Sequence, residues 1–426
     1  MTVDTALEAR ILEAVQTRFD EQLAFTRALV GFPSVRGEEA ECQAHVASEL
    51  RARGYDVDQF PLDVDAIKDK PGFAPVTVSY EKAQNVVARL PSAKDSRRSV
   101  ILNGHVDVVP PGPLSMWRRP PFEPYIEDGW LYGRGAGDMK AGVGANLFAL
   151  EALRSIDERL CAGAVFEAVV EEEATGNGTL ACVQRGYHAD VALITEPMWD
   201  RLVACQVGVL WFRVEIRGRP AHVRESETGS NAIQAALAVL NALRELEAQW
   251  NAASRRHPAY ADLKHPLAFN VGRIEGGDWP SSVPAWCAFE VRAALFPDQD
   301  LEAAKREIEH CIAQAARKIP QLEHNPPSVS YTGLHGPGYC LGRQGERAKA
   351  VLGRAHRRAY GADLQSFAST TGTDARYFGV FDQTPALVYG VTADNIHGFN
   401  ERVCLDSLLK NTQAIALFIA HWCAGD

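Results

Sequence analysis

A histidine and an aspartate two residues apart, His105 and Asp107, stand in the segment GHVDVVPPG at the end of an apolar, strand-like run. Side chains two apart on a strand share one face, and a metal-bound imidazole commonly has its second nitrogen held by a carboxylate. The pair therefore suggests a metal ligand and the group that orients it. A histidine with satisfied hydrogen bonds beside an unrelated aspartate explains the same pattern, so both interpretations stay open.

Carboxylates follow the next predicted strands. Asp138, in GRGAGDMKAG, stands where a helix of small residues begins, a position that a simple capping carboxylate also favours. Glu171, Glu172 and Glu173 directly follow the apolar strand AVFEAVV. Three adjacent carboxylates repel one another and resist burial. On a surface helix they would be a solvated face, but at the carboxyl end of a buried strand, where α/β folds place ligands, bound cations explain them better.

Two more residues complete a set of nitrogen and oxygen ligands. Glu196 ends the next strand in ITEP, and His397 lies in NIHGFNE before the last helix. Such a set can hold two divalent ions about 3.5–4 Å apart, bridged by a carboxylate and a water whose pKa falls towards about 7, while a spare carboxylate accepts the proton. The usual H-E-x-x-H and G-x-S-x-G signatures of single-zinc and serine hydrolases are absent. The glycine spacing is also not G-x-G-x-x-G, so we reject a nucleotide site.

The elements that must position these residues indicate an α/β fold. Strand-like segments alternate with helical ones, which predicts a mainly parallel sheet with helices on both faces. The predicted strands are VTVSY after Pro75, 85–90, 99–109, 164–170, 190–195 and ALVYG near the C-terminus. The predicted helices cover much of 7–54, then 141–153, 344–360 and 402–423.

A different pattern begins near Val203. A long strand run, a helix at 231–250, two further strands, a helix at 300–319 and a possible last strand at 328–331 describe an inserted, open-faced α+β (ferredoxin-like) module. Because 426 residues exceed the size at which one core stops growing, two domains are expected. We assign 1–204 and 326–426 to a metal-binding catalytic domain and 205–325 to the inserted domain.

Composition narrows the possible partners and compartment. Lys+Arg 44 against Asp+Glu 54 gives a formal net charge of −10 without a basic block, which argues against nucleic acid or an anionic membrane surface. Neither a signal peptide nor a long apolar run is evident, so a cytoplasmic protein is expected. Nine scattered cysteines predict reduced thiols rather than a disulfide framework or a cysteine-bound zinc.

Seven motifs in order give the chain a family resemblance over nearly its whole length. GHVDVVP, GRGAGDMKAG, EEE before a Gly-rich turn, ITEP, RPAH, GTDAR and NIHG look like the dinuclear zinc amidohydrolase/peptidase family of acetylornithine deacetylase, succinyl-diaminopimelate desuccinylase, aminoacylase and carboxypeptidase G. The resemblance implies two Zn²⁺ ions, with Co²⁺ or Mn²⁺ as substitutes. It also implies that the inserted module is a dimerisation or lid domain, and hence a homodimer.

The resemblance implies a role for each matched residue. His105 and Glu196 would bind one metal, Glu173 and His397 the other, and Asp138 would bridge them. Asp107 would orient His105, and Glu172 would be the general base and later the acid to the leaving nitrogen. Relatives often have a cis peptide after the bridging aspartate, which here is Asp138–Met139.

Other matched residues concern substrate. His222, otherwise a surface residue, matches a histidine that reaches the partner subunit's site and stabilises the tetrahedral oxyanion. Arg292 matches an arginine that binds the substrate carboxylate, although a strand-edge arginine paired with a nearby acid is the alternative. Gly372 and Thr373 match the lining of the substrate pocket. Many relatives carry Asn where this chain has Ser282, so the expected substrate is less defined than the metal centre.

These features predict a hydrolase that cleaves the amide bond of an N-acylated amino acid or similar small carboxylate. A dipeptidase or carboxypeptidase, or a hydrolase of an unusual amide or aryl-amine compound, is the alternative on the same scaffold. A non-catalytic binding protein would lack ligands or the base, and this sequence lacks neither.

Overall fold

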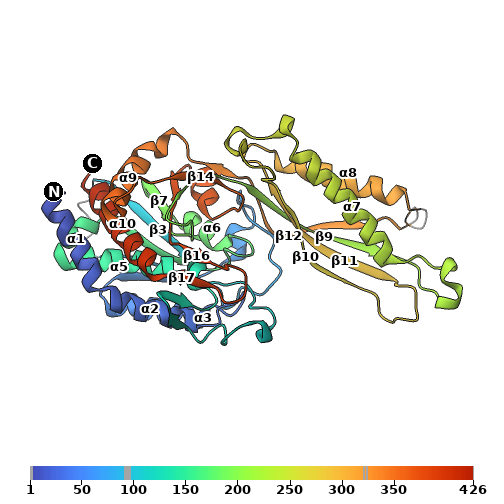
Figure 1. The fold of residues 1–426 in the computed structure, drawn as a ribbon, viewed down its shortest axis with the longest axis horizontal. Helices are drawn as coiled ribbons and strands as arrows, with labels where there is room; N and C mark the ends of the chain where they lie inside the picture. The colour runs from blue at the N-terminus through green and yellow to red at the C-terminus, as the bar shows by residue number, and fades with distance from the viewer. Residues whose placement is uncertain (1–2, 91–96, 320–321, 323–324, 426) are drawn as a thin grey trace.

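The computed structural model describes residues 3–90, 97–319, 322 and 325–425. The chain forms a larger α/β lobe, which contains both termini, and an elongated module that projects from it (Figure 1). Each part has its own buried apolar cluster. In the described part of the chain, no helix is long and apolar enough to cross a membrane.

A six-stranded mixed sheet forms the centre of the lobe. Its strands, in spatial order, are β1 (Asp56–Pro61), β2 (Gln84–Arg89), β6 (Ala164–Val169), β3 (Val100–His105), β7 (Val191–Ile194) and β15 (Ala386–Val388). The neighbours β6, β3, β7 and β15 are parallel, β2 pairs antiparallel with β6, and β1 pairs antiparallel with β2. The predicted mainly parallel sheet is therefore confirmed for its central strands.

One predicted strand is wrong. Residues 76–80 form no ladder, and two side chains of the segment contact Arg36 and Glu171 instead. The Tyr80 hydroxyl donates to the Glu171 carboxylate at 2.5 Å. The Tyr80 side chain thus contacts the loop that contains Glu171. The alternation of Val and Thr alone did not suffice to predict a strand.

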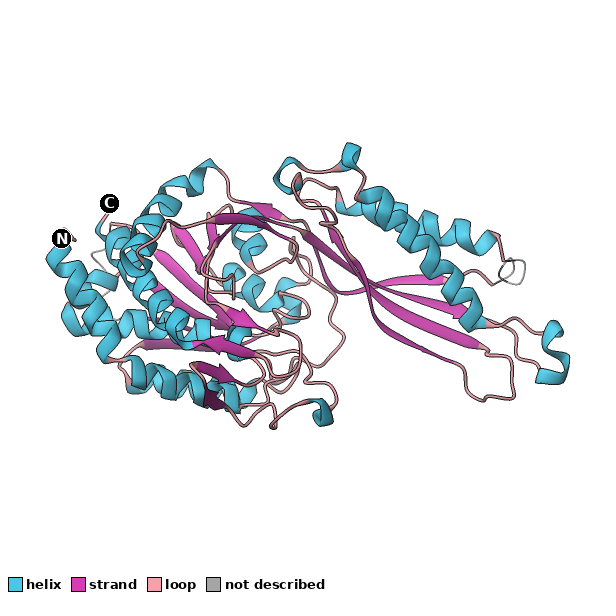
Figure 2. Ribbon diagram, viewed as in Figure 1, coloured by secondary structure: helices cyan, strands magenta, loops and turns pink. Residues whose placement is uncertain are grey.

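Helices flank the sheet on both faces (Figure 2). They are α1 (Thr5–Thr17), α2 (Phe19–Gly31), α3 (Ala40–Ala52), α4 (Val64–Ile67), α5 (Ala141–Ile156), α6 (Asn177–Gln184), α9 (Glu346–Tyr360) and α10 (Leu405–Ala424). The small residues of α5 let it approach the sheet closely, since a Cβ at Gly142 would collide with the carbonyl oxygen of Thr195. The start of α5 therefore packs against the strand end that precedes Glu196.

Two small sheets complete the lobe. One contains β16 (Ala393–Asp394), β17 (Arg402–Cys404), β5 (Trp130–Tyr132) and β4 (Tyr125–Glu127), and the other contains β13 (Tyr339–Cys340), β8 (Leu202–Gln206) and β14 (Ser366–Ser369). Cys205 and Cys340 face each other across β8 and β13, with Cα atoms 4.0 Å apart, and form a disulfide. The expectation of nine reduced thiols is wrong for this pair, because a separation of 135 residues hid the strand pairing that brings them together.

The projecting module has the β-α-β-β-α-β order that the sequence predicted. Its elements are β9 (Gly208–Arg217), α7 (Ala232–Trp250), β10 (Phe269–Gly276), β11 (Trp286–Leu295), α8 (Leu301–Arg317) and β12 (Ser328–Gly336). The sheet is antiparallel with the order β10–β11–β9–β12, and both helices cover one face (Figure 1). Because β12 pairs with β9, the sheet extends beyond residue 325. The domain boundaries at 204/205 and 325/326 stay a prediction.

Candidate metal centre

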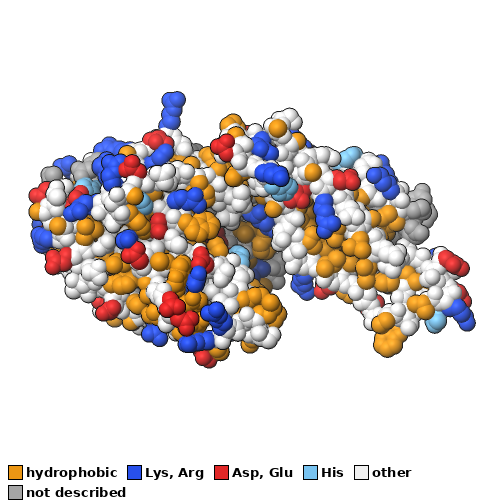
Figure 3. Space-filling view, viewed as in Figure 1, with side chains coloured by type: hydrophobic (Ala, Val, Ile, Leu, Met, Phe, Trp, Pro, Cys, Tyr) orange, Lys and Arg blue, Asp and Glu red, His pale blue; other side chains and the backbone are white. Residues whose placement is uncertain are grey.

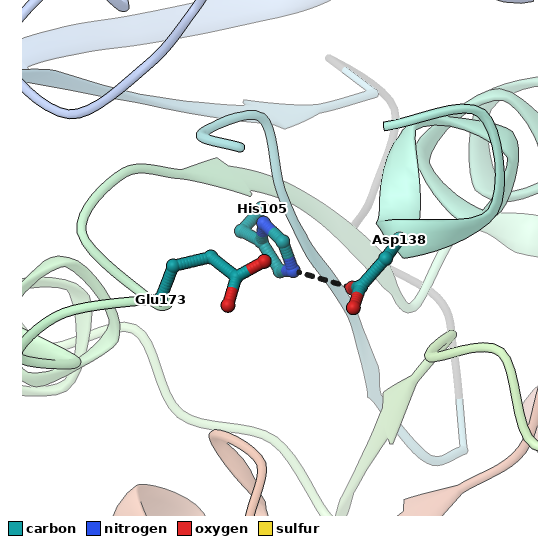
Figure 4. Close-up of side chains that lie close together, drawn as sticks. All are labelled: His105, Asp138 and Glu173. Carbon is teal, nitrogen blue, oxygen red and sulfur yellow. Dashed lines mark hydrogen bonds and ion pairs between the residues drawn. The ribbon is translucent and has the colours of Figure 1, made fainter. Parts of the chain in front are cut away.

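Three adjacent parallel strands bring the candidate ligands to one edge of the central sheet. β3 lies between β6 and β7, so the carboxyl ends of all three point the same way. His105 ends β3, the run Glu171–Glu173 follows β6, and Glu196 follows β7. Asp138 reaches this edge from the short π-helical turn η3 (Ala136–Lys140) that leads into α5. Figure 4 shows His105, Asp138 and Glu173 converging there.

Asp138 lies between two imidazoles. Its Oδ1 is 3.2 Å from His105 Nε2 and its Oδ2 is 3.3 Å from His397 Nε2. Glu173 Oε1 is 3.1 Å from His397 Nε2, and Glu196 Oε1 is 3.7 Å from His105 Nε2. The structure thus brings together all five residues proposed as ligands, and their division between two metals stays a prediction. The predicted cis peptide Asp138–Met139 is also present.

The second nitrogen of His105 is fixed by the segment that follows it. Nδ1 lies 2.9 Å from the backbone carbonyl of Asp107 and 3.5 Å from its carboxylate. That carboxylate accepts the backbone N–H groups of Glu172 (3.3 Å) and Glu173 (3.1 Å). These contacts hold the ring with Nε2 towards Asp138, 3.2 Å from its Oδ1. Asp107 therefore links the turn after β3 to the turn after β6.

The cluster concentrates negative charge in a buried place. Burial raises the pKa of Glu172, Glu173 and Glu196, and repulsion from Asp374 adds to the shift at Glu172. Burial also favours a neutral Asp138, but its contacts with the two imidazoles prevail and lower its pKa. Among the described residues, no lysine or arginine forms an ion pair with these carboxylates (Asp138, Glu172, Glu173 and Glu196).

This donor set fits divalent cations. Imidazole nitrogen and carboxylate oxygen are the ligands of zinc and similar metals. The ligand atoms of His105, Asp138 and Glu173 lie within 4.8 Å of one another, and so do those of His105, Glu172 and Glu196. Carboxylates this buried, which outnumber the two imidazoles beside them, are costly unless cations neutralise them. The cluster is therefore a possible site for divalent metals.

The three consecutive glutamates diverge. Glu171 has a backbone φ of 68° and its carboxylate points away from the cluster, where it pairs with Arg36 Nε at 2.5 Å and with Tyr80. Glu172 and Glu173 are left facing the cluster. The sequence alone did not show that the three glutamate side chains point in different directions, because the left-handed backbone of Glu171 is not evident from the residue types.

A buried carboxylate that the sequence analysis did not single out holds two site loops together. Glu401 accepts hydrogen bonds from the backbone N–H groups of Gly135 (3.0 Å), Gly137 (2.9 Å) and Asp138 (3.0 Å). It also pairs with buried Arg134 at 2.6 Å. Glu401 therefore joins the turn of Asp138 to the loop of His397. The motif NIHGFNE contains this residue, and its place four residues after His397 was the available signal.

Comparison with known proteins decides the family. The model of peptidase family M20/M25/M40 matches residues 101–421. The chain belongs to this family.

Relatives of known activity differ in substrate. The chain is 28% identical to an N-formyl-4-amino-5-aminomethyl-2-methylpyrimidine deformylase of Halalkalibacterium halodurans, covering 97% of both chains. It is 30% identical to a succinyl-diaminopimelate desuccinylase of Alkalilimnicola ehrlichii over 62% of this chain and 65% of the relative. A dipeptidase of Saccharomyces cerevisiae has a similar fold, with a TM-score of 0.79, 15% identity and 98% coverage of both chains. As an M20 member, this protein is a metal-dependent hydrolase of amide bonds.

Two cavities adjoin the cluster of candidate metal ligands and Glu172. One, of about 410 Å³, is lined by Asp138, Glu196, Trp199, Phe367 and the loop 369–373. The other, of about 420 Å³, shares Glu172, Glu173, Gly372 and His397 and extends to Arg292 on β11. Gly372 and Arg292 thus line space beside the cluster. Thr373 lines the first cavity, although its hydroxyl donates to Gln206 at 2.7 Å.

Two predicted residues lie elsewhere. His222 is exposed at the start of the 3-10 turn η5 (Val223–Thr228), where its Nδ1 accepts the N–H of Arg224. Ser282 is its bridge partner in the module and is exposed too. Neither residue lines the two cavities. Within one chain, the structure therefore does not bring His222 to the cluster.

Proposed function

We propose that this M20 hydrolase cleaves the amide bond of an N-acylated amino acid or a similar small carboxylate. The observation that carries the proposal is the second cavity, which Glu172 and Glu173 line together with Arg292. A guanidinium binds a carboxylate through two parallel hydrogen bonds. A substrate whose carboxylate pairs with Arg292 would present its amide to the cluster.

The cluster residues divide into two ligand sets. His105 and Glu196 would hold one metal, Glu173 and His397 the other, and Asp138 both, as their contacts with the two imidazoles suggest. Zn²⁺ fits these nitrogen and oxygen ligands, and Co²⁺ or Mn²⁺ are possible substitutes. When bound, such ions polarise the scissile carbonyl and make a neighbouring water more acidic.

Glu172 is the group that we assign to proton transfer. Its Oε2 is 4.0 Å from His105 Nε2, and burial raises its pKa, so it is poised to accept a proton. Glu172 would accept the proton of the attacking water at a carboxylate oxygen and deliver it to the leaving nitrogen. Asp107 holds the backbone of this residue through the N–H of Glu172, which fixes where the carboxylate stands.

Deformylation of an amine carried on an aromatic ring is a second candidate. Trp199 and Phe367 line the first cavity, with ring centroids 6.4 Å apart in an edge arrangement. Aromatic walls of this kind favour a flat ring. The pyrimidine deformylase likeness over nearly the whole length supports the same substrate type. Ser282 in place of the Asn of many relatives leaves both candidates possible.

A substrate panel on metal-loaded protein separates the candidates. The panel contains N-formyl, N-acetyl and N-succinyl amino acids, dipeptides and an N-formyl aminomethylpyrimidine. Turnover of N-acyl amino acids, abolished by chelation and restored by Zn²⁺ or Co²⁺, is expected. Chelator-insensitive turnover would contradict the metal assignment, and turnover of the pyrimidine alone would favour the second candidate.

We also propose that the protein is a cytoplasmic homodimer joined through the inserted module. Edge strand β10 exposes Val271 (38%) and Ile274 (50%), and Trp279 beyond it is 69% exposed. Hydrophobic side chains lie on the visible face of the module in Figure 3. A second copy on this edge would cover them, and it would offer a path for His222 to a neighbouring cluster.

A further inference from the structure

Three side chains form a row on the face of the module's sheet that its helices leave open. Arg292 on β11 is paired directly with Asn270 on β10 and with Trp211 on β9. The alternating neighbours Phe212 and Val291 are buried in the module's apolar core, so the row points to the opposite face. All three members of the row line the second cavity.

Arg376 completes this cavity from the lobe. Its side chain is 1% exposed, and its Nε and Nη1 have no hydrogen-bond partner. It packs against Gly336 at the end of β12 and against Gly372. The indole Nε1 of Trp211 is also buried without a partner. Two residues of the cavity wall, Arg376 and Trp211, therefore contain buried donors without a partner, in addition to Arg292.

The donor excess points to a ligand with more than one anionic group. Among the residues that the structure describes, no carboxylate lies within ion-pair distance of Arg292 or Arg376. Burial opposes the shift, but the nearby Tyr377, Asp374 and Glu172 raise the pKa of Arg376 and keep its guanidinium charged. The Arg292 guanidinium donates a hydrogen bond to the backbone carbonyl of Thr370, at 3.4 Å. A buried donor without a partner is unfavourable, and more so when it is charged. One carboxylate can pair with Arg292, and this leaves Arg376 and the indole N–H unsatisfied.

We propose that Arg376 and Trp211 form a second anionic subsite, so that the preferred substrate carries two carboxylates beyond the scissile amide. Arg292 would bind one carboxylate, and Arg376, with the indole N–H, the other. The position of the scissile amide in this inference rests on the proposed function. The pairing of a dicarboxylate with two guanidinium groups is independent of the proposed function. Arg376 was not among the substrate residues that the sequence suggested.

A binding experiment tests the subsite without catalysis. Calorimetry on metal-loaded protein compares glutarate with its monoamide, which has the same shape and one carboxylate fewer. Wild type should bind glutarate at least about tenfold more tightly. Arg376→Gln should reduce the ratio to near one, whereas the control Arg273→Gln, an exposed arginine of the same module, should keep it. A wild-type ratio near one, or a ratio unchanged in a folded, metal-loaded Arg376→Gln, overturns the proposal.

A second variant covers the case in which Arg376→Gln does not fold. Trp211→Phe removes only the indole N–H and should weaken glutarate, but not the monoamide, by about three- to tenfold. Equal weakening of both ligands would overturn the assignment of the indole. Thermal unfolding of each variant, with its metal content, establishes that it is folded.

Turnover separates this inference from the proposed function. N-acetylglutamate should have at least about tenfold higher kcat/KM than N-acetylglutamine, mainly through KM. Arg376→Gln should remove that advantage, so that the ratio of the two kcat/KM values falls to near one. Failure of every amide in the panel, with glutarate binding as expected, would remove the proposed function and keep the subsite. Equal turnover of N-acetylglutamate and N-acetylglutamine would keep the proposed function and remove the second anionic subsite.

Discussion

The edge of the central sheet and the outer end of the inserted module both carry residues suggested for catalysis, but they are built differently. At the sheet edge, His105 Nε2 lies within 4.0 Å of three carboxylates of its own chain. At the module, His222 is exposed and its bridge partner is Ser282. Parallel strands fix the first group through their backbones. His222 and Ser282 can contact a substrate only if the lobe closes on the module or a second chain binds there.

Charge separates the two regions in the same way. The sheet edge buries carboxylates without lysine or arginine partners, whereas the open face of the module pairs Arg213 with Glu215, Glu275 and Glu290 at 2.9–3.1 Å. Such exposed pairs contribute little to stability. The buried cluster is costly in the metal-free state. Cations should therefore matter greatly at the sheet edge and hardly at all at the module.

Glu172→Gln tests the chemistry of the sheet edge and should have the largest effect. Loss of the general base should lower kcat by about 10²–10⁴-fold, while metal content stays near that of wild type because two other residues sit closer to each imidazole. Glu173→Gln is the matched comparison, since its carboxylate contacts His397 at 3.1 Å, and it should lose metal. Equal metal loss in both variants would make Glu172 a ligand and not the base. Single-turnover kinetics and metal analysis provide the two measurements.

His222→Ala tests the module and should lower kcat by about 10²–10³-fold if the imidazole stabilises an oxyanion. Metal content and Tm should not change, because His222 is exposed and its hydrogen bond with the N–H of Arg224 is local. The control is His310→Ala, an exposed histidine on α8. Mixing His222→Ala with Glu172→Gln should restore activity if subunits exchange and His222 acts across the dimer. No recovery in exchanging subunits would contradict that role.

Much of the sheet edge could be predicted from the sequence because strand order and chemistry point to the same place. Apolar runs that end in His105, the glutamate run and Glu196 indicate parallel strands with a common edge. The left-handed backbone of Glu171, which turns its carboxylate to Arg36, could not be predicted. It depends on packing between segments 135 residues apart. The Cys205–Cys340 pair was missed for a similar reason.

The module shows the opposite limit. Its β-α-β-β-α-β order was evident from hydrophobic patterning, yet patterning could not show which side chains line a cavity between two parts of the chain. Arg376 lies in a motif, GTDAR, that the resemblance had already included, but its buried and unpaired nitrogens become evident only in three dimensions. Glu401 was missed likewise, because its four partners come from a turn more than 260 residues earlier.

Glu401→Ala should weaken metal binding by about 10–100-fold, the usual effect of removing a group that orients ligands. The substitution frees the turn of Asp138 and leaves Arg134 buried without its ion pair, so Tm should also fall. Asp394→Asn is the control, since it removes a more exposed ion pair with Arg402 near the same loops. Metal titrations at fixed pH measure the effect. Wild-type affinity in a folded Glu401→Ala would show that Glu401 only stabilises the fold.

The pH dependence of stability should be the smallest effect, and it should occur only without metal. Attraction to Glu173 raises the pKa of His397 to about 11, although burial opposes the shift. A raised pKa in the folded state stabilises fully below the unfolded value of about 6.5, and this contribution is lost as pH rises towards 11. The raised pKa values of Glu172 and Glu196 act with the same sign from lower pH.

Chelated protein should therefore lose Tm between pH 6.5 and 10, whereas metal-loaded protein should change less, because ligands that bind a cation no longer bind a proton. His397→Asn should flatten the chelated curve, but only in part, since the His397 side chain is 53% exposed and solvent weakens its pairing. Parallel curves for chelated and loaded wild type would mean that protons and metals do not compete at the sheet edge. The sheet edge and the module would then differ in the placement of their residues but not in their response to protons and metals.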